Sequence, residues 1–362
     1  MEKQVTSRQT CLILILVAIT TKLLFLPSLL CQDVGRDAYI YIFLFMILEV
    51  GILGIFAYLT RKYPTLDFDK LLAYLFGKVF AKIVLFLYLV YFILQTSIVF
   101  QSAYVYLYEN LYSKLEWYVY VFPLVITMAY VAFKGLNSIA RLIEMFIPMI
   151  FVGVVMVLFL GSINTDYSNA LPIMENSFFE GFVDVSKYAL WFSDYLIYLV
   201  LFGNIKTHAH YTRNIIITAI SMAVMVGFFI LVFYCLFDYS AVYHRNAITD
   251  IMQVIPRNSD IGSLDWIVTL VWDICMIIYM CLMFFASTKT CQQTFNIKHK
   301  WLSIVIVFVV LAASVFVTKF DAAMLIQYAS EYLFYFHYVV LVVIPIVMLI
   351  VGLVKHKEKA NA

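Results

Sequence analysis

Apolar residues occur in about ten long runs, separated by short polar connectors that carry almost all of the charge. A bilayer core about 30 Å thick is crossed by about 20 apolar residues in a helix that rises 1.5 Å per residue. Each run therefore predicts one crossing helix, and the chain is predicted to be an all-α polytopic membrane protein with about ten transmembrane helices. The expected helices cover residues 10–31, 38–60, 79–108, 117–133, 142–161, 188–202, 215–237, 264–287, 301–317 and 328–354.

The composition agrees with this pattern, since 65% of the residues are hydrophobic and 13% are charged. A soluble globular protein has no interior large enough for so much apolar surface. The longest connector, residues 238–263, is too short to form a domain of its own. We therefore expect one integral membrane domain over residues 1–362, with a first helical repeat at about 10–161 and a second at about 188–354.

The longest connector nevertheless carries a helical signal of its own. Between Asn246 and Pro256, apolar residues recur at helical spacing, and Asn246, Asp250 and Pro256 supply start and stop signals. These apolar residues are Ile248, Ile251, Met252 and Ile255. We expect a short amphipathic helix on the outer face that acts as a lid, the alternative being a helix that rests on lipid headgroups without a gating role.

The distribution of basic residues predicts the orientation. When the N-terminus is placed in the cytoplasm, the connectors on that side hold most of the Lys and Arg residues, including Arg61, Lys62 and Lys134. Short cytoplasmic loops are enriched in these residues, so both termini are expected to be cytoplasmic, as an even number of helices requires. The basic loops are expected to face anionic lipid and not nucleic acid.

The sequence carries no signal for catalysis. It contains no Walker A sequence, no nucleophile elbow and no zincin motif. The six cysteines lie in or beside the apolar runs without paired spacing, which indicates neither a disulfide framework nor a zinc site. We expect no enzymatic activity, no cofactor and no metal site.

Four ionisable residues interrupt the apolar runs: Lys22, Glu49, Asp194 and Asp273. A charge near the bilayer centre costs about 2.5–3.5 kcal/mol on insertion scales, so such residues normally face the bundle interior and find partners. One cation cannot neutralise three carboxylates, and at least one carboxylate is expected to be protonated or hydrogen-bonded at a wet cavity. We expect an intramembrane charge network of Lys22, Glu49 and Asp273. Asp273 is the preferred partner of Lys22, and Glu49 is the competing partner. The alternative is a purely structural ion pair.

The first and sixth runs also contain helix-breaking polar centres. The first is interrupted by Thr20-Thr21-Lys22 and by Pro27-Ser28, and the sixth by Ser193-Asp194. Interrupted helices at corresponding positions of two halves are the best sequence indication of a transporter-type binding site, because exposed backbone at that depth must line a protein cavity. Pro27 alone is equally compatible with a simple kink. The candidate ligand-binding residues are Thr20, Thr21, Leu23, Tyr91, Gln95, Phe192, Ser193 and Asp194.

A candidate gate lies where the fifth run begins. Arg141 and Glu144 are three residues apart and therefore share one helical face near the inner interface. An ion pair there is easily broken, so we expect the two residues to form a cytoplasmic gate. The alternative is that Arg141 anchors the helix to lipid phosphate.

Several short motifs, spread over nearly the whole chain, form a specific combination. They are Ser7-Arg8-Gln9, residues 26–30 (Leu-Pro-Ser-Leu-Leu), residues 35–39 (Gly-Arg-Asp-Ala-Tyr), residues 134–144 followed by Phe146 and Pro148, residues 171–176 (Leu-Pro-Ile-Met-Glu-Asn), Ser193-Asp194, and Leu264-Asp265 with Trp272. In this combination the chain resembles the B-subunit family of bacterial spore germinant receptors, relatives of the amino acid–polyamine–organocation permeases. At two positions it departs from the family: Asp194 stands where a Glu is usual, and Lys22 where a small or apolar residue is usual.

The resemblance implies a leucine-transporter-like fold with a five-plus-five inverted repeat and broken helices 1 and 6. It also implies residence in the inner membrane of a spore, beside an A subunit and a lipoprotein C subunit, and a small-molecule germinant, often an amino acid, as the ligand. The Lys22 ammonium would then take the place of a transported cation, as in cation-independent relatives. The leading hypothesis is a germinant-sensing B subunit; the alternatives are an amino-acid permease, proton-coupled or uncoupled, and a scaffold or channel component without its own ligand.

Overall fold

The structure, a computed structural model, describes residues 4–110, 116–174, 177–206, 209–254 and 265–361. These residues are helical nearly throughout and contain no β-strand; one isolated bridge joins Val5 to Ile205. The first half consists of α1 (Ser7–Thr20), α2 (Leu26–Val34), η1 (Gly35–Asp37), α3 (Ala38–Lys62), α4 (Phe68–Phe76), α5 (Lys78–Asn110), α6 (Trp117–Lys134) and α7 (Leu136–Ile163).

The second half begins with η2 (Tyr167–Ala170), α8 (Phe178–Ser186), η3 (Ala189–Phe192) and η4 (Asp194–Leu201). It continues with α9 (Tyr211–Phe237), η5 (Asp238–Tyr243), α10 (Ala247–Val254), α11 (Asp265–Phe295) and α12 (Lys300–Thr318). The chain ends with α13 (Ala322–Glu331), α14 (Phe334–Tyr338), the π-helical segment η6 (Val339–Val343) and α15 (Ile344–Asn361).

Within the described residues, eight helices are long and apolar enough to cross a membrane. The expected number was about ten, and the difference lies in the first and sixth crossings, which are divided into short pieces. Helix α1 has 14 residues, and α2 begins only at Leu26, with Pro27 in its first turn, where a missing N–H is tolerated. In the sixth crossing, α8 has 9 residues and is followed by the 3₁₀ segments η3 and η4.

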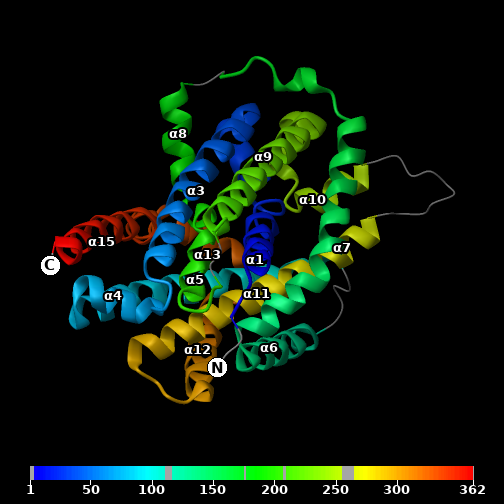
Figure 1. Ribbon diagram of the computed structural model, residues 1–362. Helices are drawn as coiled ribbons and strands as arrows, with labels where there is room; N and C mark the ends of the chain where they lie inside the picture. The colour runs from blue at the N-terminus through cyan, green and yellow to red at the C-terminus, as the bar shows by residue number, and fades with distance from the viewer. Residues whose placement is uncertain (1–3, 111–115, 175–176, 207–208, 255–264, 362) are drawn as a thin grey trace.

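The bundle has a buried centre and a lipid-compatible surface. Helix α1 lies in the middle and packs against α7, α9 and α11, while α11 also packs along α5 (Figure 1). The outer helices α6, α7 and α12 expose large apolar side chains such as Phe122, Val152 and Val309. An apolar outer surface around a polar centre is expected of a membrane protein whose interior carries the function. The division into two sequence repeats stays a prediction.

The short helix expected in the longest connector is present as α10, and Ile248, Ile251 and Met252 form its buried face. Ile255, Pro256 and the rest of the connector to residue 263 lie outside the described residues. The connector after α3 contains a second amphipathic helix, α4, which the pattern of long apolar runs did not predict. Its nine residues are too few to register as an apolar run.

The packing of α8 on α3 allows a test of the divided sixth crossing. A Cβ atom added at Gly181 of α8 would collide with the ring and hydroxyl of Tyr41 on α3, whereas one added at Gly51 would meet nothing within 4 Å. Gly181→Ala is therefore expected to lower stability by about 1–3 kcal/mol, the usual cost of overpacking. Gly51→Ala is the matched control and is expected to leave the thermal unfolding midpoint in detergent unchanged or slightly higher. Equal midpoints for the two variants would contradict the close approach of α8 and α3.

Candidate functional site

The breaks in the first and sixth crossings bring three of the four intramembrane ionisable residues together. The Lys22 ammonium lies 2.7 Å from Asp194 Oδ2 and 3.2 Å from Glu49 Oε2, and none of the three side chains is exposed. The expected pairing of Lys22 with Asp273 is therefore wrong, and the competitor Glu49 is one of the two partners. The reason is that helical spacing ends at the break after Thr20, and the turn directs Lys22 toward α3 and the start of η4.

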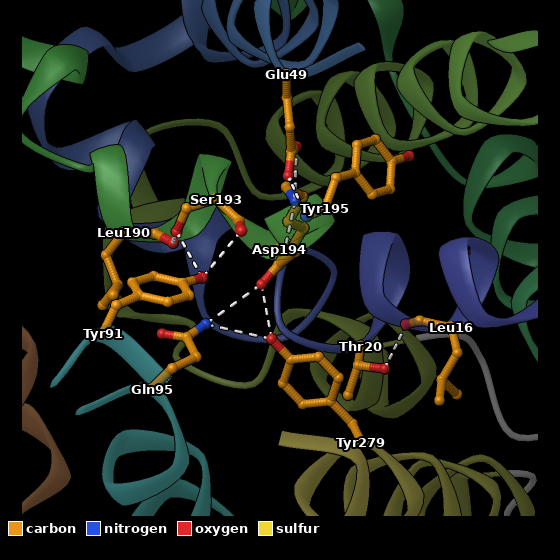
Figure 2. A network of polar contacts seen from close by, with 11 residues as sticks. Leu16, Thr20, Glu49, Tyr91, Gln95, Leu190, Ser193, Asp194, Tyr195 and Tyr279 are labelled. Carbon is orange, nitrogen blue, oxygen red and sulfur yellow. Dashed lines mark hydrogen bonds and ion pairs between the residues drawn. The ribbon is translucent and has the colours of Figure 1, made fainter. Parts of the chain in front are cut away.

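The second oxygen of the Asp194 carboxylate, Oδ1, accepts hydrogen bonds from side chains of α5 and α11. The Tyr279 hydroxyl donates to Asp194 Oδ1 at 2.6 Å, and Gln95 Nε2 donates to the same oxygen at 3.3 Å. Gln95 Nε2 also lies 3.2 Å from the Tyr279 hydroxyl, which closes a three-membered network (Figure 2). Hydrogen bonds to a charged group are the stronger kind, so this network fixes the orientation of Asp194.

Glu49 reaches the same point from the opposite side. Its Oε1 atom accepts a hydrogen bond of 3.0 Å from the backbone N–H of Tyr195, in the first turn of η4 (Figure 2). The first N–H groups of a helical segment have no partner within the segment, and a carboxylate satisfies them well. The Lys22 ammonium also lies 5.9 Å from the centroid of the Tyr195 ring. Glu49 thus connects α3 to both broken crossings.

This centre is rich in acceptors. One ammonium faces two carboxylates, and among the described residues the buried atom Gln95 Oε1 has no hydrogen-bond partner. A buried acceptor without a partner costs about 1–3 kcal/mol. The arrangement is therefore suited to accept a further proton or a donor-rich cationic group. It holds no nucleophile with an adjacent base, and no cluster of three or more His, Cys, Asp or Glu that suits a metal ion occurs in the described part of the chain.

The break in the sixth crossing is fixed by a separate set of hydrogen bonds. The Tyr91 hydroxyl lies 2.9 Å from the carbonyl oxygen of Ser193 and 3.0 Å from its Oγ, and Ser193 Oγ donates to the Leu190 carbonyl (Figure 2). These bonds occupy groups that lie outside regular α-helical pairing. Irregular backbone at membrane depth is tolerated only where protein groups satisfy it in this way.

The eight candidate ligand-binding residues are all buried, but they do not form one cluster. Tyr91, Gln95, Ser193 and Asp194 lie together around the charge network. The Thr20 hydroxyl instead donates to the Leu16 carbonyl at 2.6 Å and lies 3.1 Å from Cys275 Sγ. Thr21 and Leu23 lie in the break itself. The Phe192 ring stacks on the Phe45 ring, with 4.8 Å between the ring centroids. Their role in binding a ligand stays a prediction.

Sequence reasoning missed Tyr279, which contacts both Gln95 and Asp194. Its position had one usable signal, because Tyr279 follows Cys275 by four residues and therefore shares the face of α11 that contacts Thr20. With 27 tyrosines in the chain, residue type alone did not distinguish it. This face of α11 is distinguished from the others only by its contact with the break in the first crossing.

Glu144 pairs with Arg8 and not with Arg141 as the spacing predicted, and the gate role of Arg141 and Glu144 stays a prediction. Glu144 Oε1 pairs with Arg8 Nε at 3.4 Å, and Glu144 Oε2 accepts from Gln9 Nε2 at 3.2 Å, whereas the Arg141 side chain is exposed. Spacing along α7 places Arg141 near Glu144, but the start of α1 packs beside α7 and supplies the closer cation. The Gln9 side chain also accepts from the Thr6 N–H, in a capping box that fixes the start of α1.

A backbone connection joins the same end of α1 to the end of η4. The Val5 N–H donates to the Asn204 carbonyl at 2.7 Å, and the Lys206 N–H donates to the Val5 carbonyl at 3.0 Å. Gly203, with φ +77°, makes the turn that brings this segment alongside Val5. The start of α1 and the end of η4 are therefore tied to each other and, through Glu144, to α7.

We expect Glu144→Gln to loosen this closure at the start of α1. The pair with Arg8 is partly exposed, at 76% and 33% for the two side chains, so its loss costs about 0.2–1 kcal/mol and shifts a closed–open equilibrium by up to about fivefold. The measurement is the rate at which a thiol reagent labels Cys11, the part-exposed cysteine of α1. Arg141→Gln is the matched control on the same helix, and an equal increase in that variant would contradict the assignment of the pair.

Helix α10 contacts the break in the first crossing. The Ala247 N–H, at the start of α10, donates to the Leu24 carbonyl in the break at 3.1 Å. His244 Nδ1 lies 3.4 Å from Asp250 Oδ2, and burial raises the pKa of the Asp250 carboxyl while the nearby His244 partly opposes this. The predicted lid helix is thus hydrogen-bonded directly to the backbone of the first divided crossing.

Two divided crossings around a buried ionic centre, closed from both ends, define a membrane protein with the leucine-transporter-like fold. Solved structures agree: MhsT in complex with L-phenylalanine is similar over 98% of this chain and 99% of that chain, with a TM-score of 0.66 and 13% identity. A manganese transporter of Eremococcus coleocola is similar over 95% and 78% of the two chains, with a TM-score of 0.60 and 12% identity. At such identities the likeness shows the fold alone.

The family follows from the sequence comparison. Residues 4–322 match the family model described as spore germination protein, and the chain belongs to this family. No curated protein sequence matches the chain. The resemblance drawn from the short motifs is confirmed at the level of the family and the fold.

Proposed function

We propose that this protein is the germinant-binding B subunit of a spore germination receptor, and that it holds a small solute with an amino group, such as an amino acid, beside Asp194. The observation that carries the proposal is the buried centre in which one ammonium faces two carboxylates at the junction of both divided crossings. A ligand ammonium beside this centre would supply the missing positive charge and the donor that Gln95 Oε1 lacks.

The assignment of a receptor role rests on the family and on Lys22. Lys22 occupies the space between the two divided crossings with a cation that is covalently part of the chain and cannot leave with a solute. We place the protein in the spore inner membrane with both termini in the cytoplasm and A and C subunits as partners. The excess of basic residues in the inner connectors supports this orientation.

A secondary amino-acid permease is the second candidate. The specific observation in its favour is that the chain has closures on both sides of the centre, the Glu144 contacts with α1 at one end and α10 at the other. Transport by alternating access requires two such closures that open in turn. A sensor uses the same binding site but needs no net passage of solute.

The test is equilibrium binding and uptake of radiolabelled amino acids, in vesicles that contain the full chain alone. Asp194→Asn is expected to abolish saturable binding, whereas Glu180→Gln, which removes an exposed carboxylate from α8, is expected to leave it unchanged. Binding without net uptake supports the receptor, and uptake supports the permease. Saturable binding that is the same in Asp194→Asn and in the unmodified chain would refute the placement of the ligand beside Asp194.

A further inference from the structure

Asp273 is the intramembrane carboxylate that the central ion cluster leaves out. It lies on α11 six residues before Tyr279, about 9 Å along the helix toward the end where α10 packs. Its residue is only 6% exposed, and neither carboxyl oxygen has a hydrogen-bond partner among the described residues. Of the described cations, none forms an ion pair with it.

The negative charge of an ionised carboxylate in this position is not compensated by an ion-pair partner among the described residues. A charge near the bilayer centre is costly even when water reaches it, and a buried charge without a partner is strongly destabilising. The neutral carboxylic acid avoids most of this penalty, because it carries no net charge. The closed arrangement described here therefore favours Asp273 with a proton bound.

The groups that face Asp273 lead toward the outer surface. The hydroxyl of Tyr106, on α5, lies against Thr249 of α10 and Thr269 of α11 and within electrostatic reach of both Asp273 and Asp250. Asp250 is in turn paired with the partly exposed His244.

We propose that Asp273 is a proton-binding site, which takes up one proton from the outer face as α10 closes over the centre and releases it as α10 opens. On closure the carboxylate oxygen keeps one proton taken from the outer medium as water is excluded from it. On opening, water reaches Asp273 and the proton returns to the outer medium. Acidic conditions thus favour the closed lid, whatever solute occupies the site beside Asp194.

The test measures opening of α10 as a function of pH. Met252 is 6% exposed on the buried face of α10, so a thiol introduced by Met252→Cys reacts with a membrane-impermeant maleimide only when the helix lifts. The full chain is labelled in lipid vesicles between pH 5 and pH 8, and labelling at position 252 is quantified by peptide mass spectrometry. Each rate is divided by that of Tyr239→Cys, a site 72% exposed, which removes the intrinsic pH dependence of the thiol.

With native Asp273, the normalised rate is expected to rise with pH, by up to about tenfold per pH unit for one coupled proton. In Asp273→Asn, where the amide imitates the neutral acid, the rate is expected to stay at its low acidic value throughout. An identical profile in both proteins, or a flat profile in both, would overturn the proposal. So would a pH dependence that survives Asp273→Asn and disappears in His244→Gln, because the proton would then belong to His244.

A second readout does not depend on the stability of a variant. Infrared difference spectra of the ¹³C-aspartate-labelled chain, between acidic and alkaline pH, are expected to contain the C=O stretching band of a protonated carboxyl that is lost when α10 opens. The band is expected to be absent from Asp273→Asn and retained in Asp250→Asn. A carboxyl band that persists unchanged in Asp273→Asn would place the proton elsewhere and refute the proposal.

Discussion

Lys22→Met is expected to destabilise the folded protein by about 3–5 kcal/mol, the largest loss expected for any single substitution in this chain. The variant removes the ammonium that lies 2.7 Å from Asp194 and 3.2 Å from Glu49 and leaves both carboxylates fully buried. The methionine side chain has a similar length and fills most of the same space, so the loss measures charge and not packing. The measurement is the midpoint of thermal unfolding of the purified protein in detergent.

Neutralising the carboxylates should restore much of this loss. The triple variant Lys22→Met, Glu49→Gln and Asp194→Asn is expected to unfold well above Lys22→Met, because an uncharged centre carries no ionic desolvation penalty. The pair of Lys70 with Asp67 is the matched control, since it has a similar distance of 3.0 Å but side chains that are 62% and 35% exposed. Lys70→Met is expected to change stability by less than about 1 kcal/mol. If the triple variant loses as much stability as the three single variants together, the charges of Lys22, Glu49 and Asp194 do not compensate one another.

The crossing helices and the residues that interrupt them were predictable from sequence, because both depend on local properties. Hydropathy locates a helix at membrane depth, and a Lys or Asp inside an apolar run is conspicuous wherever it points. For the same reason α10 was predictable: Ile248, Ile251 and Met252 repeat at the period of a helix, and this period decides which face is buried.

The partners of Lys22 were not predictable, because they depend on the direction of side chains around a break. Up to Thr20 the helical period fixes the direction in which each side chain points, but the turn after Thr20 rotates the chain by an amount that no spacing encodes. Asp194 and Asp273 were therefore indistinguishable by depth alone. The same limit explains Glu144, where the spacing suggested Arg141, but Arg8, more than 130 residues away in the sequence, supplies the pair.

Tyr279→Phe is expected to weaken both the stability of the centre and its affinity for a solute. It deletes the hydroxyl that donates to Asp194 Oδ1 at 2.6 Å and leaves the ring in place. Hydrogen bonds to charged groups contribute about 1.5–3 kcal/mol, so the unfolding midpoint should fall accordingly. Because Asp194 also loses the group that orients it, the affinity for a solute beside Asp194 is expected to fall by at least about tenfold, the factor that 1.4 kcal/mol produces.

Tyr91→Phe is the matched control for this prediction, since both tyrosines are fully buried and both hydroxyls bond into the sixth crossing. The Tyr91 hydroxyl bonds the neutral backbone oxygen and Oγ of Ser193, at 2.9 Å and 3.0 Å, and makes no bond with Asp194. Neutral hydrogen bonds contribute about 0.5–1.5 kcal/mol, so the loss of stability should be roughly half that of Tyr279→Phe. Equal losses in the two variants would contradict the assignment of Asp194 as a charged acceptor for the Tyr279 hydroxyl.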